Sequence, residues 1–497
     1  MGTPTTIVIP TIGRPSLHQL LAALTDDGAC DAPIIVVDDR PAASAAAAEL
    51  ADLPPGNIQV IASGGRGPAA ARNVGWRASR TRWVTFLDDD VLPQAQWPAL
   101  LRRDIAEAAP DVVGVQGNVS VPLPSDRRPT DWERVTAGLE TARWITADMT
   151  YRRRSLAAVG GFDERFPRAF REDADLALRV IAQGGRLVRG RRGVIHPVRP
   201  VDDWVSVRVQ AGNADDVLMR RLHGPHWRRR AQAPRGRRAR HLAVTATGLA
   251  TFALAVSGRR RAAVLPALAW LVGTAELASA RIRPGPRTVA EVRRMVITSL
   301  AIPPAAGWHT LRGYRRHRHA TAWRGQPELV LFDRDGTLIY DVPYNGDPDR
   351  AVPVDDAKRS LDLLRAHGVR VGVVTNQSGV STGKLTAEQV NATNARVEQL
   401  LGPFDVWQVC QHGRSDGCGC RKPEPGMVKA ACQELDVDPA WCVLVGDIGS
   451  DVAAAQAAGC EAILVPTPMT RPAEVESAPM VEADLDSAVR RILAGAW

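Results

Sequence analysis

FDRDGTLIY, residues 332–340, decides the fold of the C-terminal part of the chain. The apolar run that leads into it reads as a buried strand, and it delivers Asp333 and Asp335 to one face at the strand end. Two carboxylates this close repel each other unless a cation lies between them, and Mg²⁺ favours such an oxygen-rich site. One carboxylate can then attack phosphorus while the other moves a proton. The motif therefore predicts an α/β domain with phosphoryl chemistry at a strand end.

Three later segments end in polar residues that should converge on the same edge of the sheet. A threonine and an asparagine can donate hydrogen bonds to phosphate oxygens, a lysine can supply a fixed positive charge, and a third aspartate can hold Mg²⁺. The residues are Thr375 and Asn376 in VVTNQSG, Lys422 in CRKP, and Asp447 in VGDIGSD, with Asp451 one helical turn beyond. Helix-like stretches that end in Gly separate these segments, so we predict a doubly wound sheet over 326–497.

In this order, the motifs resemble the haloacid-dehalogenase-like phosphohydrolases. The nearest branch contains D-glycero-D-manno-heptose 1,7-bisphosphate 7-phosphatases and histidinol-phosphate phosphatases. The resemblance implies Asp333 as nucleophile and Asp335 as general acid and base. It implies Mg²⁺ held by Asp333, Asp447 and the Asp335 carbonyl, with Thr375, Asn376, Arg421 and Lys422 at the phosphate. The loop after the first motif matches the heptose branch only loosely, so histidinol phosphate stays open as the alternative substrate.

CQHGRSDGCGCRKP, residues 410–423, holds four metal-binding side chains within eleven residues. The spacing of Cys410, His412, Cys418 and Cys420 suits tetrahedral Zn²⁺. All four ligands fall in one short loop and leave no coordination position open, so we expect a structural zinc rather than a separate finger. Arg421 and Lys422 follow at once, and the zinc should fix the position from which they reach the phosphate.

The N-terminal region alternates buried strands with amphipathic stretches. TTIVIPT, PIIVVDD and WVTFLDDD read as parallel strands that end in carboxylates, which predicts a second doubly wound sheet over 1–215. An Asp-x-Asp at a strand end, Asp88 and Asp90, can chelate a divalent metal that bridges a diphosphate. Glu172 and Asp173 begin a predicted helix, and one of them can act as the general base for a sugar hydroxyl.

As a set, these motifs resemble inverting family 2 glycosyltransferases of the GT-A fold. The resemblance implies a nucleotide-diphosphate sugar donor and Mn²⁺ or Mg²⁺ at Asp88 and Asp90. It also implies Asp39 near the nucleotide, Arg72 and Asn73 in the donor loop, and Asp173 as the base, with Glu172 as the alternative. His196 either approaches the diphosphate or metal or is a satisfied loop residue.

The middle of the chain, 216–325, is an Arg-rich hydrophobic segment. Between Val217 and Gly325 there are 22 Arg, no Lys and two acidic residues, although the whole chain carries only +9. Two apolar runs, 242–257 and 262–280, are separated by GRRR, and Pro303-Pro304 breaks a third. This pattern predicts either a helical hairpin on an anionic membrane surface or a soluble helical linker. Whether it spans, lies on or avoids the membrane stays open.

The bulk composition excludes several classes of protein. A hydrophobic content of 45% and a charged content of 24% are typical of globular domains. The seven Cys, four of them scattered, do not resemble a secreted disulfide framework, so we expect a cytoplasmic protein. Association of its middle segment with the inner face of the plasma membrane is one of the alternatives left open above. The arginines are interleaved with apolar rather than hydrophilic residues, which argues against nucleic acid as a partner.

Taken together, the sequence predicts a bifunctional α/β enzyme of two doubly wound domains joined by a basic helical segment. The first would use a nucleotide-sugar donor. The second would hydrolyse a sugar phosphate through an aspartyl-phosphate intermediate, with heptose 1,7-bisphosphate as the expected substrate.

Overall fold

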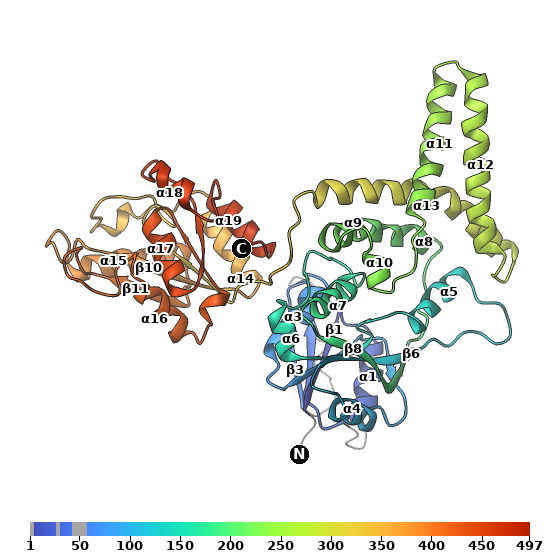
Figure 1. The fold of residues 1–497 in the computed structure, drawn as a ribbon, viewed down its shortest axis with the longest axis horizontal. Coiled ribbons are helices and arrows are strands. Elements are labelled where there is room, and N and C mark those ends of the chain that lie inside the picture. Colours follow the sequence, from blue (N-terminus) through green and yellow to red (C-terminus); the bar gives the residue numbers. More distant parts are fainter. Residues whose placement is uncertain (1–3, 26–29, 42–56) are drawn as a thin grey trace. The chain divides into compact units, whose positions relative to one another are not determined.

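The computed structural model of the chain describes residues 4–25, 30–41 and 57–497. It divides into two compact units, Met1–Thr321 and Ala322–Trp497. Figure 1 shows their helices and strands. The predicted α/β class is confirmed in both units, and a helical segment follows the first sheet. The predicted domain boundaries at 215 and 325 stay a prediction.

The sheet of unit 1 has eight strands in the order β3-β2-β1-β4-β7-β6-β8-β5. The predicted parallel strands are β1 (Thr5–Thr11), β2 (Ile34–Asp38) and β4 (Trp83–Leu87). β7 is antiparallel to both of its neighbours, so the sheet is mixed rather than wholly parallel. The other strands are β3 (Ile58–Ala62), β5 (Leu92–Pro93), β6 (Val112–Ser120), β7 (Asp148–Arg152) and β8 (Arg186–Ile195).

Helices cover both faces of this sheet, so the apolar side chains of its strands are buried on both sides. α1 (Ser16–Thr25) and α4 (Trp97–Ala106) pack on one face. α3 (Pro68–Ala78), α6 (Arg153–Ala158) and α7 (Glu172–Ala182) pack on the other. The helix predicted to begin at Glu172 and Asp173 is therefore confirmed. The other α-helices before the apolar runs, within the described residues, are α5 (Asp131–Ala137), α8 (Val205–Arg208), α9 (Gly212–His223) and α10 (Trp227–Arg230).

The two predicted apolar runs form the helices α11 (Arg238–Val256) and α12 (Arg260–Ile282), a hairpin that projects from the rest of unit 1 (Figure 1). Within the described residues these two helices are long and apolar enough to cross a membrane, with mean hydropathies of 1.3 and 1.5. The third run does not break at Pro303-Pro304, because α13 (Val289–Arg316) continues through both prolines. α13 packs closely on α9, because a Cβ on Gly313 would be 2.8 Å from Ala214 Cα.

Unit 2 has five parallel strands in the order β11-β10-β9-β12-β13. Helices cover both faces of the sheet, as predicted for a doubly wound domain. The strands are β9 (Leu329–Phe332), β10 (Arg370–Asn376), β11 (Val406–Cys410), β12 (Cys442–Gly446) and β13 (Glu461–Leu464). The helices are α14 (Ala357–Ala366), α15 (Ala387–Leu401), α16 (Gly426–Glu434), α17 (Gly449–Ala458), α18 (Pro472–Ser477) and α19 (Leu485–Leu493).

Candidate active sites

Three carboxylates and one lysine meet at the carboxyl edge of the sheet in unit 2. Asp333 follows β9, Asp447 follows β12 and Asp451 lies in the first turn of α17, with one carboxylate oxygen of each within 4.8 Å of the others. Lys422 Nζ lies 2.9 Å from Asp333 Oδ1 and 2.6 Å from Asp451 Oδ1, and it donates to the Val374 carbonyl. The structure thus brings together residues that the sequence spreads over positions 333–451.

Burial controls the ionisation of this cluster. Burial raises the pKa of Asp333 to about 8, although the charge of Lys422 acts in the opposite direction. Burial and the charge of Asp451 together raise the pKa of Asp447 to about 7. Burial disfavours the charged lysine, but the Asp333 and Asp451 carboxylates outweigh it and raise the pKa of Lys422. Asp447 Oδ1 is buried and has no hydrogen-bond partner among the described residues. A divalent cation fits here, since it would ionise the carboxylates and satisfy that oxygen.

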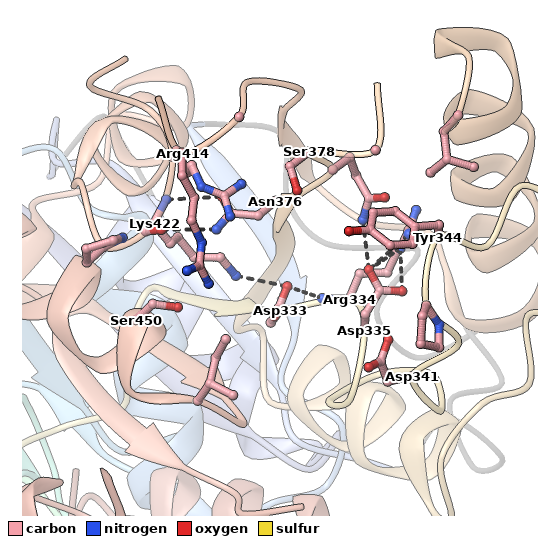
Figure 2. A pocket seen from close by; sticks show the side chains of 18 of the residues that line it. Asp333, Arg334, Asp335, Asp341, Tyr344, Asn376, Ser378, Arg414, Lys422 and Ser450 are labelled. Atoms are coloured by element: carbon pink, nitrogen blue, oxygen red, sulfur yellow. Dashed lines mark hydrogen bonds and ion pairs between the residues drawn. The ribbon is translucent and has the colours of Figure 1, made fainter. Parts of the chain in front are cut away.

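Asp335 is held apart from this cluster by its own partners. Arg334 Nη2 lies 2.9 Å from Asp335 Oδ2, and Gln377 Nε2 donates to the same oxygen at 2.7 Å. Arg334 is anchored in turn because its Nη1 donates to Asn394 Oδ1 at 2.6 Å. Figure 2 shows Asp335 turned toward Arg334 while Asp333 faces Lys422. The Asp335 side chain is therefore paired with Arg334 and Gln377 rather than with Lys422.

Gly336 is required by the geometry of the Asp333 loop. Its φ is +78°, a left-handed conformation that favours glycine. A Cβ at this position would lie 2.3 Å from Asp447 Oδ2. Any larger residue would therefore push Asp447 out of the cluster, which explains why a glycine follows the two aspartates.

A cavity of about 1110 Å³ opens over the cluster. Asn376, Arg421 and Lys422, which the sequence analysis expects at the phosphate, line this cavity. Asn376 is bound to the Lys422 backbone by two hydrogen bonds of 3.1 Å. Thr375 is fully buried, accepts a hydrogen bond from Gln377 Nε2 at 2.9 Å, and is not among the residues that line this cavity.

Sequence reasoning missed several residues of the cavity wall. Arg414 lines it from the loop between His412 and Cys418, and Ser378 and Ser450 add hydroxyl groups (Figure 2). Tyr344 also lines it, with Lys384 Nζ 4.0 Å from the centroid of its ring. The position of Arg414 could have been predicted, because it lies in the metal-binding loop that also leads to Arg421 and Lys422 at the phosphate site.

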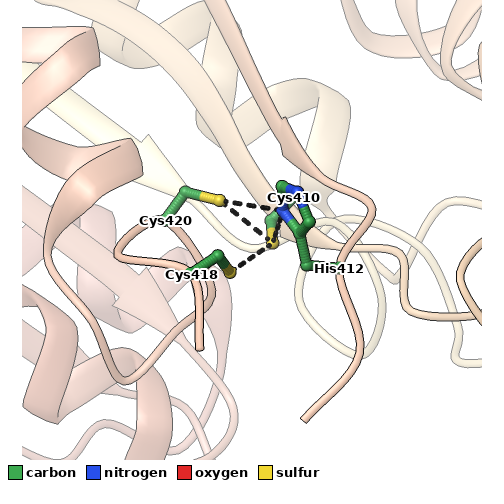
Figure 3. A group of neighbouring side chains, drawn as sticks. All are labelled: Cys410, His412, Cys418 and Cys420. Carbon is green, nitrogen blue, oxygen red and sulfur yellow. Dashed lines mark hydrogen bonds between the residues drawn. The ribbon is translucent and has the colours of Figure 1, made fainter. Parts of the chain in front are cut away.

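The four predicted zinc ligands lie together: Cys410 is the last residue of β11, and His412, Cys418 and Cys420 belong to the loop that follows (Figure 3). Cys410 Sγ lies 3.6 Å from His412 Nδ1, 3.8 Å from Cys418 Sγ and 3.3 Å from Cys420 Sγ. Cys420 Sγ is also 3.3 Å from His412 Nδ1. Three sulfurs and one ring nitrogen at these separations fit one tetrahedral metal ion. Arg421 is tied to the same loop, since its Nη1 donates to the His412 carbonyl at 3.2 Å.

In unit 1, Asp88, Asp90 and His196 bring potential metal ligands within 4.8 Å of one another. Arg199 Nε lies 2.8 Å from Asp90 Oδ2, and His196 Nε2 lies 3.6 Å from Asp90 Oδ1. Burial, followed by the neighbouring Asp88, raises the pKa of Asp90. The predicted metal pair therefore gains His196 as a neighbour, which the sequence analysis had left undecided.

Arg72 connects the metal pair to the start of α7. Its guanidinium lies 2.8 Å from Asp88 Oδ1 and 2.9 Å from Glu172 Oε1. Burial, then the charge of Asp173, raises the pKa of Glu172 to about 8, and burial likewise raises the pKa of Asp173. Both acids line a cavity of about 240 Å³, but Glu172 is engaged by Arg72 and almost fully buried. The geometry therefore favours Asp173 over Glu172 as the group that meets an acceptor hydroxyl.

Asp39 and Asn73 occupy different surroundings. Asp39 lines a second cavity of about 200 Å³ next to Asp88, and it accepts a hydrogen bond from Ser63 at 2.7 Å. Asn73 is fully buried in α3, and its amide bonds the Phe162 backbone, Glu164 and Trp76. Asn73 therefore braces the loop at 162–164 and has no group directed to either cavity.

Two family models match the chain. The model for glycosyl transferase family 2 matches residues 6–175, and the HAD-hydrolase-like model matches residues 419–488. The chain is thus an enzyme with a glycosyltransferase domain and a phosphatase domain, as the sequence predicted.

Curated relatives identify the family to which the second domain belongs. The chain is 35% identical over 144 residues to a D-glycero-beta-D-manno-heptose-1,7-bisphosphate 7-phosphatase of Pseudomonas aeruginosa, which covers 28% of this chain and 81% of the relative. It is 34% identical over 155 residues to a D-glycero-alpha-D-manno-heptose-1,7-bisphosphate 7-phosphatase of Mycobacterium tuberculosis, covering 28% and 80%. Through this region the chain belongs to the family of heptose-bisphosphate phosphatases. A solved D,D-heptose 1,7-bisphosphate phosphatase from B. bronchiseptica, complexed with magnesium and phosphate, is 32% identical; the match covers 33% of this chain and 98% of that one, with a TM-score of 0.32.

Proposed function

We propose that unit 2 removes the 7-phosphate of D-glycero-D-manno-heptose 1,7-bisphosphate. The observation that carries this proposal is the contact of Lys422 with Asp333 and Asp451 beneath a cavity lined by arginines. Membership of the heptose-bisphosphate phosphatase family supports the sugar. The relatives are named for heptose bisphosphate, so histidinol phosphate is not favoured as the substrate.

In the proposed reaction, Asp333 attacks the phosphorus of the 7-phosphate. A bond forms between its carboxylate oxygen and phosphorus, and the bond from phosphorus to the sugar oxygen breaks. Asp335 gives its proton to that leaving oxygen. It then takes a proton from a water molecule, which attacks the aspartyl phosphate, releases inorganic phosphate and restores Asp333. Lys422 balances the charge on the phosphoryl oxygens throughout, and Asn376 donates a hydrogen bond to them.

Mg²⁺ is the cation that we propose for this site. Asp333 and Asp447 would hold it together with the Asp335 carbonyl, and Asp451 lies within reach. When bound, the ion would neutralise charge on the phosphate oxygens. The buried, unpartnered Asp447 Oδ1 and the raised pKa values of Asp333 and Asp447 support a cation at this position.

We propose a structural Zn²⁺ at Cys410, His412, Cys418 and Cys420. All four positions of a tetrahedral ion would be taken by protein atoms, which is typical of structural zinc. Arg421 and Lys422 follow the last ligand directly, and Arg414 lies inside the loop. Fixing the loop would therefore hold three cations over the cavity, where a substrate with two phosphates needs them.

For unit 1 we propose transfer of a sugar from a nucleotide-diphosphate donor. Asp88 and Asp90 would hold Mn²⁺ or Mg²⁺ at the donor diphosphate, Asp39 would meet the nucleotide, and Arg72 would contact the donor while it positions Glu172. Asp173 would take the proton of the acceptor hydroxyl. The neighbouring cavities beside Asp39 and Asp173 support this division into a donor side and an acceptor side.

We also propose that the α11–α12 hairpin inserts into the membrane with the catalytic domains on the cytoplasmic side. The 19 residues of α11 extend about 28 Å, close to the ~30 Å hydrocarbon core of a bilayer. Large apolar side chains are exposed along the hairpin, including Leu249, Phe252 and Leu265. Arginines are more numerous at its base than at its tip, which places the base on the cytoplasmic side.

A substrate comparison tests the phosphatase proposal. The purified chain should release phosphate from heptose 1,7-bisphosphate at least about tenfold more efficiently than from histidinol phosphate. Supplying the α and β anomers separately would assign the anomer, because the two relatives differ in this respect. Equal or better turnover of histidinol phosphate would refute the heptose assignment.

A further inference from the structure

A series of cavities leads from the donor side of the transferase toward its apolar helices. The donor cavity beside Asp39 and the catalytic cavity beside Asp173 share Arg72 and Arg199 in their walls, so they are neighbours. The catalytic cavity in turn shares Trp132 and Val135 with a third cavity of about 280 Å³. The cavity beside the proposed base Asp173 thus has a neighbouring cavity that lies toward the apolar helices.

The series ends at the hairpin. The third cavity shares Arg237, His241 and Leu277 with a fourth cavity of about 610 Å³ at the base of α11 and α12. The wall of this fourth cavity is mostly hydrocarbon, contributed by Val244, Val272 and Pro303 among others. An elongated molecule could therefore have one end at Asp173 and the other between apolar helices.

Close packing and an ion pair link the elements that line the cavity series. A Cβ on Gly273 would lie 2.5 Å from Val244 Cγ2, so α11 and α12 are in direct contact. At the base, Arg281 on α12 bonds Asp131 on α5 at 2.8 Å and also Thr298 on α13. Because α5 also carries Trp132 and Val135, the helices and the catalytic cavity share one support.

Charge along the series is uneven. In the third cavity, Arg281 is matched by Asp131 on α5, and Arg294 is matched by Asp203 and by Glu291 on its own helix. In the fourth cavity, Arg237 and Arg240 both lie 3.2 Å from the single carboxylate of Glu276. One positive charge is left over there, at the boundary between the polar base and the apolar hairpin. This is the place for an anionic group that joins a polar head to a hydrocarbon chain.

We propose that the acceptor of the transferase is a phosphate-linked lipid, an inference that rests on the proposed transferase function of unit 1. Its hydrocarbon chain lies along α11, α12 and α13, its phosphate meets Arg237 and Arg240, and its hydroxyl-bearing head reaches Asp173 through the third cavity. The acceptor oxygen forms the bond to the sugar as the bond from the sugar to the nucleoside diphosphate breaks. Asp173 receives the hydroxyl proton.

Binding of geranylgeranyl phosphate to the full chain in detergent micelles tests this inference. Arg240→Gln removes the unmatched charge from the fourth cavity. Arg259→Gln is the matched control, because it removes an exposed arginine from the tip of the same hairpin. We expect Arg240→Gln to weaken binding about tenfold and Arg259→Gln to leave it unchanged. Both side chains are exposed, so neither change should unfold the chain.

The same preparations should bind geranylgeraniol and inorganic phosphate more weakly than the lipid phosphate. Equal affinity for geranylgeraniol, or equal losses from the two arginine variants, would overturn the acceptor site. Binding of UDP and GDP with Mn²⁺ is measured in parallel. A chain that binds a nucleotide but not the lipid phosphate refutes the acceptor inference alone, whereas one that binds neither refutes the transferase function as well.

Discussion

Asp451 gives the sharpest test of the phosphatase site, because the sequence motif assigns it no role and the structure pairs it with Lys422. Both side chains are about 1% exposed, and the ammonium lies 2.6 Å from Asp451 Oδ1. Asp451→Asn keeps the shape of the side chain and removes its charge. Asp333 then remains as the single carboxylate in contact with Lys422.

The expected cost follows from this geometry. Two unit charges 2.6 Å apart attract each other by roughly 6 kcal/mol at an effective dielectric constant of about 20. Removing one partner of a buried pair destabilises a protein by about 3–5 kcal/mol. Because Asp333 still contacts the lysine, we expect the lower end, about 3 kcal/mol with Mg²⁺ present. Without Mg²⁺ the cost should be smaller, since Asp451 also repels Asp333 and Asp447.

The assay is urea unfolding of residues 322–497, a compact unit of the size at which the phosphatase relatives exist alone. Asp451→Asn, Lys422→Met and the double variant form a thermodynamic cycle, with exposed Asp349→Asn as the control. We expect a coupling of about 2 kcal/mol and a fall in kcat of roughly tenfold to a hundredfold. Additive effects of the two substitutions, or full activity in Asp451→Asn, would show that the ion pair does not position Lys422.

Three further predictions concern the metal sites and the nucleophile. In buffer without Mg²⁺, and with the zinc site loaded, the melting temperature should fall as the pH rises from about 4 to 8. Asp333 and Asp447 hold protons in the folded state that the unfolded chain releases near about pH 4. Mg²⁺ should reverse this fall, and a flat profile would contradict it. Cys418→Ala should release zinc and lower both stability and phosphatase activity while Mg²⁺ still binds. Full activity without zinc would contradict the proposal that zinc fixes the position of Arg421 and Lys422. Asp333→Asn should abolish phosphate release, below about 0.1% of wild type, and leave nucleotide binding by unit 1 intact; residual turnover would assign the nucleophile elsewhere.

Local patterns in the sequence were enough to predict the strands and the residues at their ends. Runs such as LVLF and TTIVIPT are fully buried strands, and parallel strands end at one edge of a sheet, so Asp333, Asp447 and Asp88 could be predicted to lie at such edges. The zinc loop was equally local, because its four ligands lie within eleven residues.

Features that depend on tertiary contacts could not be predicted in this way. Asn73 matches the transferase motif, but its amide is used up by the loop at 162–164. Thr375 matches the phosphatase motif, but its hydroxyl accepts a hydrogen bond from Gln377, and Thr375 is not among the residues that line the cavity. α13 continues through Pro303 and Pro304 and packs against α9, and neither feature can be read from the pattern of prolines.

The chemistry of the two proposed reactions constrains why one chain would carry both. Removing the 7-phosphate of heptose 1,7-bisphosphate leaves a sugar 1-phosphate, whereas the transferase needs a nucleotide-diphosphate sugar. A nucleotidyl transfer must therefore convert the sugar 1-phosphate into the nucleotide-diphosphate sugar before the transferase can use it. Direct passage of the sugar 1-phosphate from the phosphatase site to the transferase site would bring no benefit, because the transferase cannot use that sugar. What the fusion can supply is location. The apolar hairpin belongs to the transferase unit, so a membrane that holds α11 and α12 also holds the phosphatase. The sugar 1-phosphate would then be released beside the surface where its activated form is consumed.

Deleting residues 238–282 should leave phosphate release in solution unchanged but should move the phosphatase activity out of the membrane fraction. A phosphatase that stayed with the membrane would contradict this argument.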